Sequence, residues 1–132
     1  MIDGSREFGV LALNPATEVA LTDVLVRDTL PQACAETTCS EMPAGIGAGS
    51  YVGASLSMSR FVVERAALCG LMLGEAEIDL LEGEVREHEI GICLQVEGYD
   101  LDRLTSSVSF VDNETNLQAT DLPLPQLAVT GL

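Results

Sequence analysis

The chain's only histidine stands among carboxylates, and this cluster has the residue types best suited to chemistry. His88 lies between Glu87 and Glu89, and Glu82 and Glu84 come shortly before it. Carboxylates beside an imidazole can bind a metal or exchange protons as acid and base. Catalytic carboxylates, however, need burial or a fixed partner to shift their pKa. The crowded charges and the glycine among them favour a solvated hairpin tip, and we interpret the segment in that way.

A second group of oxygen-rich residues has ligand types that calcium prefers. Asp100 and Asp102 precede a predicted strand over 106–111, and Asp112 and Glu114 follow it. Calcium needs about six oxygen ligands around one point. The two pairs are expected at opposite ends of the strand, and neither has the ligand spacing of a full calcium loop. These four residues are the calcium candidates, but we expect no metal and no other cofactor.

The four cysteines bear on the compartment of the protein. Cys34 and Cys39 are close in sequence, whereas Cys69 and Cys93 are far apart. Four cysteines allow three disulfide pairings, and the sequence does not choose among them. We favour four reduced thiols, with Cys69 and Cys93 as small core residues. A zinc site has little support, because no second cysteine pair or histidine pair completes it.

Motifs for nucleophilic catalysis and phosphate binding are missing from the sequence. Serines are plentiful, but none stands in a G-x-S-x-G elbow. The glycine-rich stretch over 45–49 lacks the lysine of a phosphate-binding loop, so we interpret it as a flexible loop. We predict that the protein is not an enzyme.

Alternation of apolar and polar residues predicts strands along most of the chain. The clearest run is 90–97, where Ile90, Ile92 and Leu94 occupy alternate positions. Residues 18–29 alternate as well, with a register slip near Asp23 that indicates a bulge or two short strands. The alternating residues predicted to form the core are Val19, Leu21, Val26, Leu56, Met58, Ile78, Leu80, Ile90, Ile92, Leu94, Val108 and Phe110.

These runs predict an all-β fold of seven or eight short strands. We expect a single-domain antiparallel β-sandwich, immunoglobulin-like or jelly-roll-like, with at most one short helix near 62–73. Residues 1–7 are expected to form a flexible N-terminal arm. Residues 8–120 are expected to form the sandwich with a long surface loop over 31–50, and 121–132 an extended segment containing prolines. No internal repeat is visible in the sequence.

Two short stretches resemble a known kind of repeat. Residues 24–31, V-L-V-R-D-T-L-P, resemble the V-x-V-x-D-T-L-P strand end of sandwich repeats in bacterial surface proteins. Residues 47–50 and the strand predicted after them are similar to a later part of those repeats. The resemblance implies a β-sandwich, in agreement with the fold class expected from alternation.

The charge balance excludes two classes of partner. The chain has 21 acidic residues against 6 arginines and no lysine, a formal net charge of −15. Such a field repels nucleic-acid phosphates and anionic membranes, so neither is expected as a partner. A halophilic origin and an arginine-rich, high-GC genome would each explain the missing lysine. The sequence shows no signal peptide and no apolar run long enough to span a membrane.

Two function classes remain. We expect a non-enzymatic structural or assembly protein, such as a decoration, head-completion or tail protein of a viral particle, present in the virion or in the cytoplasm before assembly. The alternative is a secreted or cell-surface β-sandwich binding module. The expected partners are copies of the chain and other subunits, contacted through the termini and the 31–50 loop. The candidate interaction residues are Phe8, Val10, Leu122, Leu124, Leu127 and Val129.

Overall fold

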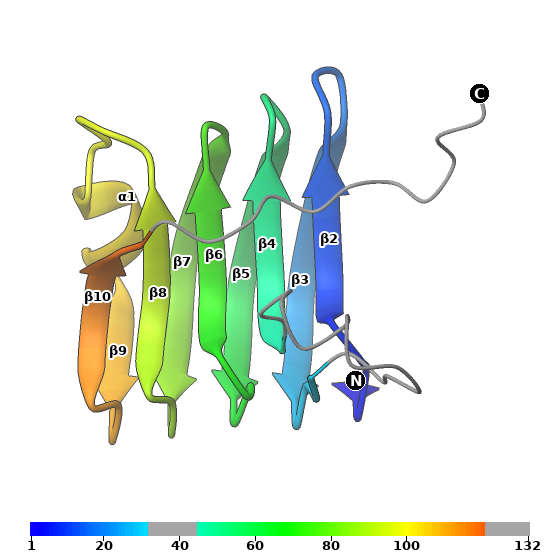
Figure 1. The fold of residues 1–132 in the computed structure, drawn as a ribbon, viewed down its shortest axis with the longest axis vertical. Coiled ribbons are helices and arrows are strands. Elements are labelled where there is room, and N and C mark those ends of the chain that lie inside the picture. The colour runs from blue at the N-terminus through cyan, green and yellow to red at the C-terminus, as the bar shows by residue number, and fades with distance from the viewer. Residues whose placement is uncertain (32–44, 121–132) are drawn as a thin grey trace, which may run out of the picture.

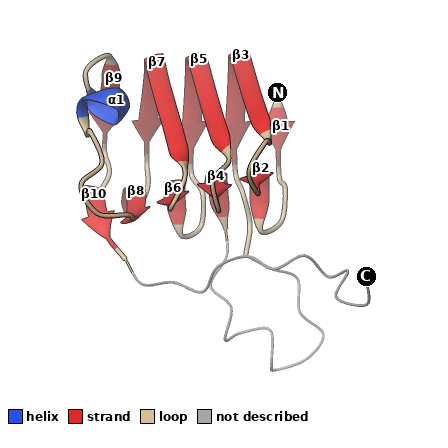
Figure 2. Ribbon diagram, turned by 90° about the horizontal axis from the view of Figure 1, so that it is seen from above, coloured by secondary structure: helices blue, strands red, loops and turns tan. Residues whose placement is uncertain are grey.

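The chain coils through two parallel β-sheets that face each other (Figures 1 and 2). The computed structural model describes residues 1–31 and 45–120. The first sheet consists, in order, of β1 (Ile2–Asp3), β3 (Glu18–Arg27), β5 (Ser55–Glu64), β7 (Glu77–Arg86) and β9 (Val108–Val111). The second consists of β10 (Thr115–Ala119), β8 (Ile90–Gln95), β6 (Cys69–Gly74), β4 (Ile46–Tyr51) and β2 (Phe8–Leu13).

From β2 onward, each strand lies in the opposite sheet from the strand before it. Two consecutive strands therefore make one turn of a coil, and each turn pairs with the next. Ser55 pairs with Glu77, 22 residues later. In the preceding turn the stacked residues Asp23 and Arg60 are 37 residues apart, because extra residues stand between β3 and β4. This architecture is a β-solenoid, in which each turn packs only against its neighbours.

The antiparallel sandwich expected from the sequence is wrong. All strand pairings between the named strands are parallel. Alternation reports a strand with one buried face, and it is the same whichever way the neighbouring strand runs. The sandwich implied by the resemblance of residues 24–31 is wrong for the same reason. The coil is also an internal repeat, although the sequence did not reveal one.

The helix expected near 62–73 is wrong as well. This segment holds the end of β5, a corner and β6. The corner begins at Arg65, whose φ of 51° breaks any regular helix. Within the described residues the only helix is α1 (Asp102–Thr105), a single turn at one end of the coil (Figure 2).

The long strands of the first sheet bend at a stacked column of residues. Asp23, Arg60 and Glu82 have φ values of 57°, 50° and 53°, and the pairing on either side of them skips that column. A residue in the left-handed region turns the strand sharply, so each strand covers two sides of the coil. The register slip predicted near Asp23 is confirmed.

The core is built from stacked columns inside the coil. Val19, Leu56 and Ile78 form one such column, next to each other in register. Leu56 and Ile78 are 1% and 0% exposed. Nearly all residues predicted for the core lie in or against this main apolar cluster. The exception is Ile90, which packs in a second cluster outside the coil.

A column of glycines brings the two sheets close together at one edge. Gly9, Gly47, Gly70 and Gly91 occupy equivalent positions in β2, β4, β6 and β8, where the pairing skips one residue. A Cβ on Gly47 would lie 2.6 Å from the Gly70 carbonyl oxygen and 2.6 Å from Val63 Cγ1. Only glycine allows this approach, because real Cβ atoms do not come so near.

Candidate interaction surfaces

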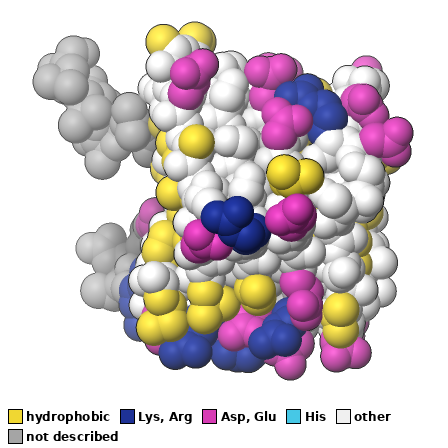
Figure 3. Space-filling model, turned by 180° about the vertical axis from the view of Figure 1, so that it is seen from behind, with side chains coloured by type: hydrophobic (Ala, Val, Ile, Leu, Met, Phe, Trp, Pro, Cys, Tyr) yellow, Lys and Arg dark blue, Asp and Glu magenta, His cyan; other side chains and the backbone are white. Residues whose placement is uncertain are grey.

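Paired charges lie on the outer side of the first sheet, among uncharged and apolar side chains. Figure 3 shows arginine and carboxylate side chains gathered on this side of the molecule. Along one corner, Arg65 bridges the turns before and after it. Its Nε lies 2.7 Å from Asp28 Oδ1, and its Nη1 lies 2.9 Å from Glu87 Oε2. The hydrogen bonds from Arg65 lower the pKa of Asp28. These ion pairs of Arg65 join three successive turns. Because both carboxylates are paired with the arginine, neither is placed to act as a general base.

One carboxylate of this corner is buried. Glu64 is 4% exposed, and it forms ion pairs with Arg65 Nη2 at 3.1 Å and Arg86 Nη2 at 2.6 Å. Its Oε2 also accepts a hydrogen bond from Arg86 Nε at 2.7 Å. A buried charge is tolerated only when it is paired in this way. Glu64 therefore has a structural role in the described part of the chain.

The acidic segment around His88 is not the solvated hairpin tip that we expected. β7 and β8 lie in different sheets, so residues 87–89 form a corner of the coil. His88 is 4% exposed. Its backbone N–H donates to Asn113 Oδ1 at 3.0 Å, and its Nδ1 lies 3.1 Å from the same oxygen. That oxygen can only accept, so Nδ1 carries the proton and Nε2, to which the described residues offer no hydrogen-bond partner, does not.

The pKa of His88 is lowered, because burial disfavours the imidazolium. The hydrogen bond to Asn113 and the charges of Glu87 and Glu64 oppose this effect without overcoming it. Asn113 also donates to the Val85 carbonyl oxygen at 2.9 Å, so the pair of side chains closes this corner of the coil.

The calcium candidates lie in two separate places. Asp100 and Asp102 stand at the start of α1, where Asp100 Oδ1 accepts from the Asp102 backbone N–H at 3.1 Å. Asp112 and Glu114 lie beyond the other end of β9, at the corner with His88. Among the residues described, no group of three or more histidine, cysteine or acidic side chains is placed to hold a metal ion.

The outer face of the second sheet is apolar. Phe8, Ile46, Cys69 and Ile90 are neighbours in register across four strands. They belong to a cluster separate from the main core, together with Tyr51, Met72 and Cys93. Phe8 and Tyr51 meet edge to face with ring centroids 5.9 Å apart. We call this cluster the outer apolar face.

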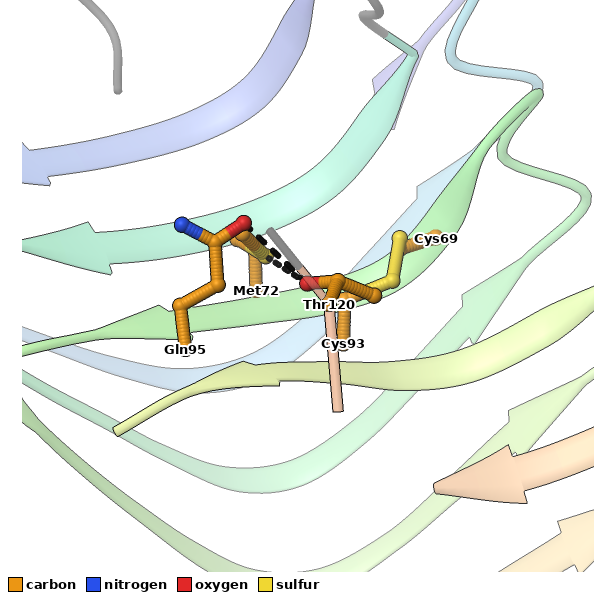
Figure 4. The surroundings of a disulfide bond; sticks show 5 residues. All are labelled: Cys69, Met72, Cys93, Gln95 and Thr120. Atoms are coloured by element: carbon orange, nitrogen blue, oxygen red, sulfur yellow. Dashed lines mark hydrogen bonds between the residues drawn. A yellow bond between two sulfur atoms is a disulfide. The ribbon is translucent and has the colours of Figure 1, made fainter. Parts of the chain in front are cut away.

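A disulfide joins two strands on this face (Figure 4). Cys69 of β6 and Cys93 of β8 are bonded, with their Cα atoms 6.0 Å apart. The expectation of reduced thiols is wrong for this pair, because parallel stacking places neighbouring turns within bonding distance. Cys34 and Cys39 lie outside the described residues.

The candidate interaction residues fall into three places. Phe8 lies on the outer apolar face, whereas Val10 of the same strand packs against the main core. The remaining candidates lie outside the described residues and are Leu122, Leu124, Leu127 and Val129.

The two ends of the coil differ. At the C-terminal end, α1 packs against β7, with Leu104 fully buried and Arg103 Nε 2.6 Å from Asp79 Oδ1. Tyr99 adds a hydrogen bond from its hydroxyl to the Ile78 carbonyl oxygen at 2.7 Å. At the N-terminal end, β1 pairs only with Val26 and Arg27 of β3. Within the described residues, the rest of that edge of β3 has no strand beside it.

Comparisons with known proteins identify no relative: no family model, curated protein or solved structure matches the chain. In the described part of the chain, no helix has the length and apolar character needed to cross a membrane.

Sequence reasoning missed the outer apolar face and its disulfide. A signal for them exists in residues 69–73, C-G-L-M-L, which are apolar without alternation. Such a run is typical of a strand covered on both sides. All six residues of β6, and all six of β4, are buried.

Proposed function

We propose that the protein is a non-enzymatic structural subunit of a multi-chain assembly, such as a viral particle, and that it joins its neighbour through the open N-terminal end of the coil. The observation that carries this proposal is the change in burial along the stack. Val19 and Leu21 in the first turn are half-buried, whereas their stacked neighbours Leu56 and Met58 are 1% and 0% exposed.

The backbone of the first turn supports the same proposal. A strand at the edge of a sheet has unpaired N–H and C=O groups that can pair with another chain. Among the strands that the structure describes, β2 and most of β3 form such edges. A strand of another subunit could complete both the hydrogen bonding and the apolar packing of this end.

The opposite end favours a defined assembly over an open-ended fibre. A coil with two equal open ends could stack without limit, since one end would fit the other. At the C-terminal end of the coil, α1 and Tyr99 cover the first half of β7, including Ile78 and Asp79, which a further turn would otherwise reach. Subunits that join only through the N-terminal end of the coil form a contact that does not propagate into a fibre.

The test is association of the full chain, measured by light scattering during size-exclusion chromatography. We expect the wild-type chain to associate, and Leu21→Lys to remain monomeric with an unchanged far-ultraviolet circular dichroism spectrum. Leu81→Lys is the matched control, because Leu81 is 53% exposed on the outer side of β7. A wild-type chain that is monomeric at all concentrations, and is absent from purified particles, would contradict the proposal.

A second function is favoured by the disulfide. Disulfides persist in oxidising surroundings, which include virion and cell surfaces as well as secreted proteins. The Cys69–Cys93 bond therefore also fits a secreted or cell-surface binding module with this solenoid fold. Antibody labelling separates the two functions, since an assembly subunit is found in particles and a surface module on the producing cell or in its medium.

A further inference from the structure

The two sheets have outer faces of opposite character. On the first sheet, the outward column Glu18, Ser55 and Glu77 is polar. On the second sheet, the outward residues form the outer apolar face. A sheet face exposed to water carries polar columns, like the one on the first sheet, so the second sheet has the composition of a covered face.

The centre of the outer apolar face is buried, whereas the members at its rim are half-buried. Tyr51 is 1% exposed, and Met72 and Cys93 are each 0% exposed, although they point away from the core. Within the described residues, the cluster contains only side chains of the second sheet and Leu68, which adjoins it. Apolar side chains of the other described elements therefore do not supply the cover.

The last described residue lies on this face. The Thr120 backbone N–H donates to the Leu94 carbonyl oxygen at 2.8 Å, and its Oγ1 lies 3.1 Å from Gln95 Oε1. The same hydroxyl contacts Met72 Sδ at 4.0 Å, although Met72 belongs to β6 and β8 lies between β6 and β10. Figure 4 shows Thr120 beside Met72 and the disulfide. The Thr120 side chain thus reaches past β8 to β6 on the outer face, while its backbone still pairs with β8.

The sequence that follows fits a path across this face. Residues 121–132, D-L-P-L-P-Q-L-A-V-T-G-L, hold five large apolar side chains and one acidic side chain. Pro123 and Pro125 lack the N–H groups of a ladder strand, but an extended segment that crosses strands needs no ladder. Twelve extended residues span up to about 40 Å, and the strands from β6 to β2 cover only about 10 Å.

We propose that residues 121–132 of the same chain dock across the outer apolar face, over β6 and β4 toward β2, and shield the Cys69–Cys93 disulfide. The segment acts as a strap that holds successive turns from outside, independently of the open end used in the proposed assembly.

Photo-cross-linking tests the docking directly. With Leu124→p-benzoylphenylalanine, we expect cross-links to peptides of β4 or β6, within one chain, at every protein concentration. Mixing isotopically heavy and light chains identifies any cross-link between copies. Leu81→p-benzoylphenylalanine, on the outer face of the first sheet, is the matched control and should give no such product. Cross-links between copies, to the first sheet, or to nothing would overturn the proposal.

Reduction of the disulfide provides a second measurement. In the variant Leu122→Ser/Leu124→Ser, we expect the Cys69–Cys93 bond to be reduced roughly tenfold faster, since access limits thiol exchange. Gln126→Ser is the control and should keep the wild-type rate. Alkylation with mass spectrometry follows this bond separately from Cys34 and Cys39. An unchanged rate in the double variant, with an unchanged circular dichroism spectrum, would contradict shielding by the segment.

Discussion

At the residue scale, His88 is the side chain whose behaviour differs most from what its neighbours in the sequence imply. Four nearby glutamates favour an exposed, protonated imidazole, but only the fold determines which of these groups is buried. Asn113, 25 residues later, accepts both hydrogen bonds that fix the ring. The sequence showed the acidic cluster around His88 but not its partner Asn113. Nothing in the residues of one corner indicates which residues of the next coil turn will stack against them.

His88 should make stability depend on pH in a defined range. Its pKa is lowered from the ordinary value of 6.5, so below 6.5 the unfolded chain binds a proton that the folded chain resists. We expect the free energy of unfolding to fall as pH decreases from 6.5 toward the folded pKa, with a slope of at most about 1.4 kcal/mol per pH unit.

Urea denaturation across this range measures the effect, and His88→Gln is the control that should lose this part of the slope. Asp23, Asp28 and Asp79, whose pKa values their arginine partners lower from 3.8, titrate well below the pH at which the contribution of His88 begins. The same slope in both proteins would exclude His88 as its origin.

At the element scale, the strands were predicted far better than their partners. The alternating run over 18–29 and the run over 90–97 correspond to β3 and β8. The relative direction of neighbouring strands was not predictable, because parallel and antiparallel strands show the same alternation of apolar and polar residues. The prediction of a helix near 62–73 was wrong because its helical spacing of apolar residues had another cause. Cys69 points outward and Leu73 inward, so the spacing combines residues from the two sides of one strand.

The glycine column of the second sheet gives an element-scale prediction. Gly47→Ala should destabilise the fold by roughly 1–3 kcal/mol, because its Cβ would meet backbone of β6 and a core valine at the same time. Ser57→Ala, on the outer side of β5, should change stability by less than about 0.5 kcal/mol. Thermal and urea unfolding measure both. Equal stability of the two variants would mean that the sheets are not held at this separation.

At the scale of the whole molecule, the repeat was hidden by unequal turns. Stacked residues are 22 apart between β5 and β7, but 37 apart between β3 and β5 and 25 apart at the last corner. The turns also have similar backbone shapes although their sequences differ at most positions. A valine recurs at Val26, Val63 and Val85 and a glycine at Gly47, Gly70 and Gly91, and these are the residues that the shape requires.

The net charge gives a prediction for the whole molecule. Arg27, Arg60, Arg65, Arg86 and Arg103 already form ion pairs, so most of the remaining carboxylates repel one another without compensation. Salt screens this repulsion, and we expect the unfolding midpoint to rise from low to molar sodium chloride. Sucrose at equal osmolality is the control for exclusion effects. A midpoint that stays constant or falls would show that the ion pairs outweigh the repulsion.

The long connection between β3 and β4 has an evolutionary consequence. It adds residues to one turn, yet Val26 still stacks on Val63 and Val63 on Val85, as if the turns were equal. Insertions at a corner are therefore nearly neutral for the rest of the coil, and so is the gain of a whole turn by duplication of a segment. Such a chain can acquire new surface loops, or lengthen, while every existing contact keeps its place.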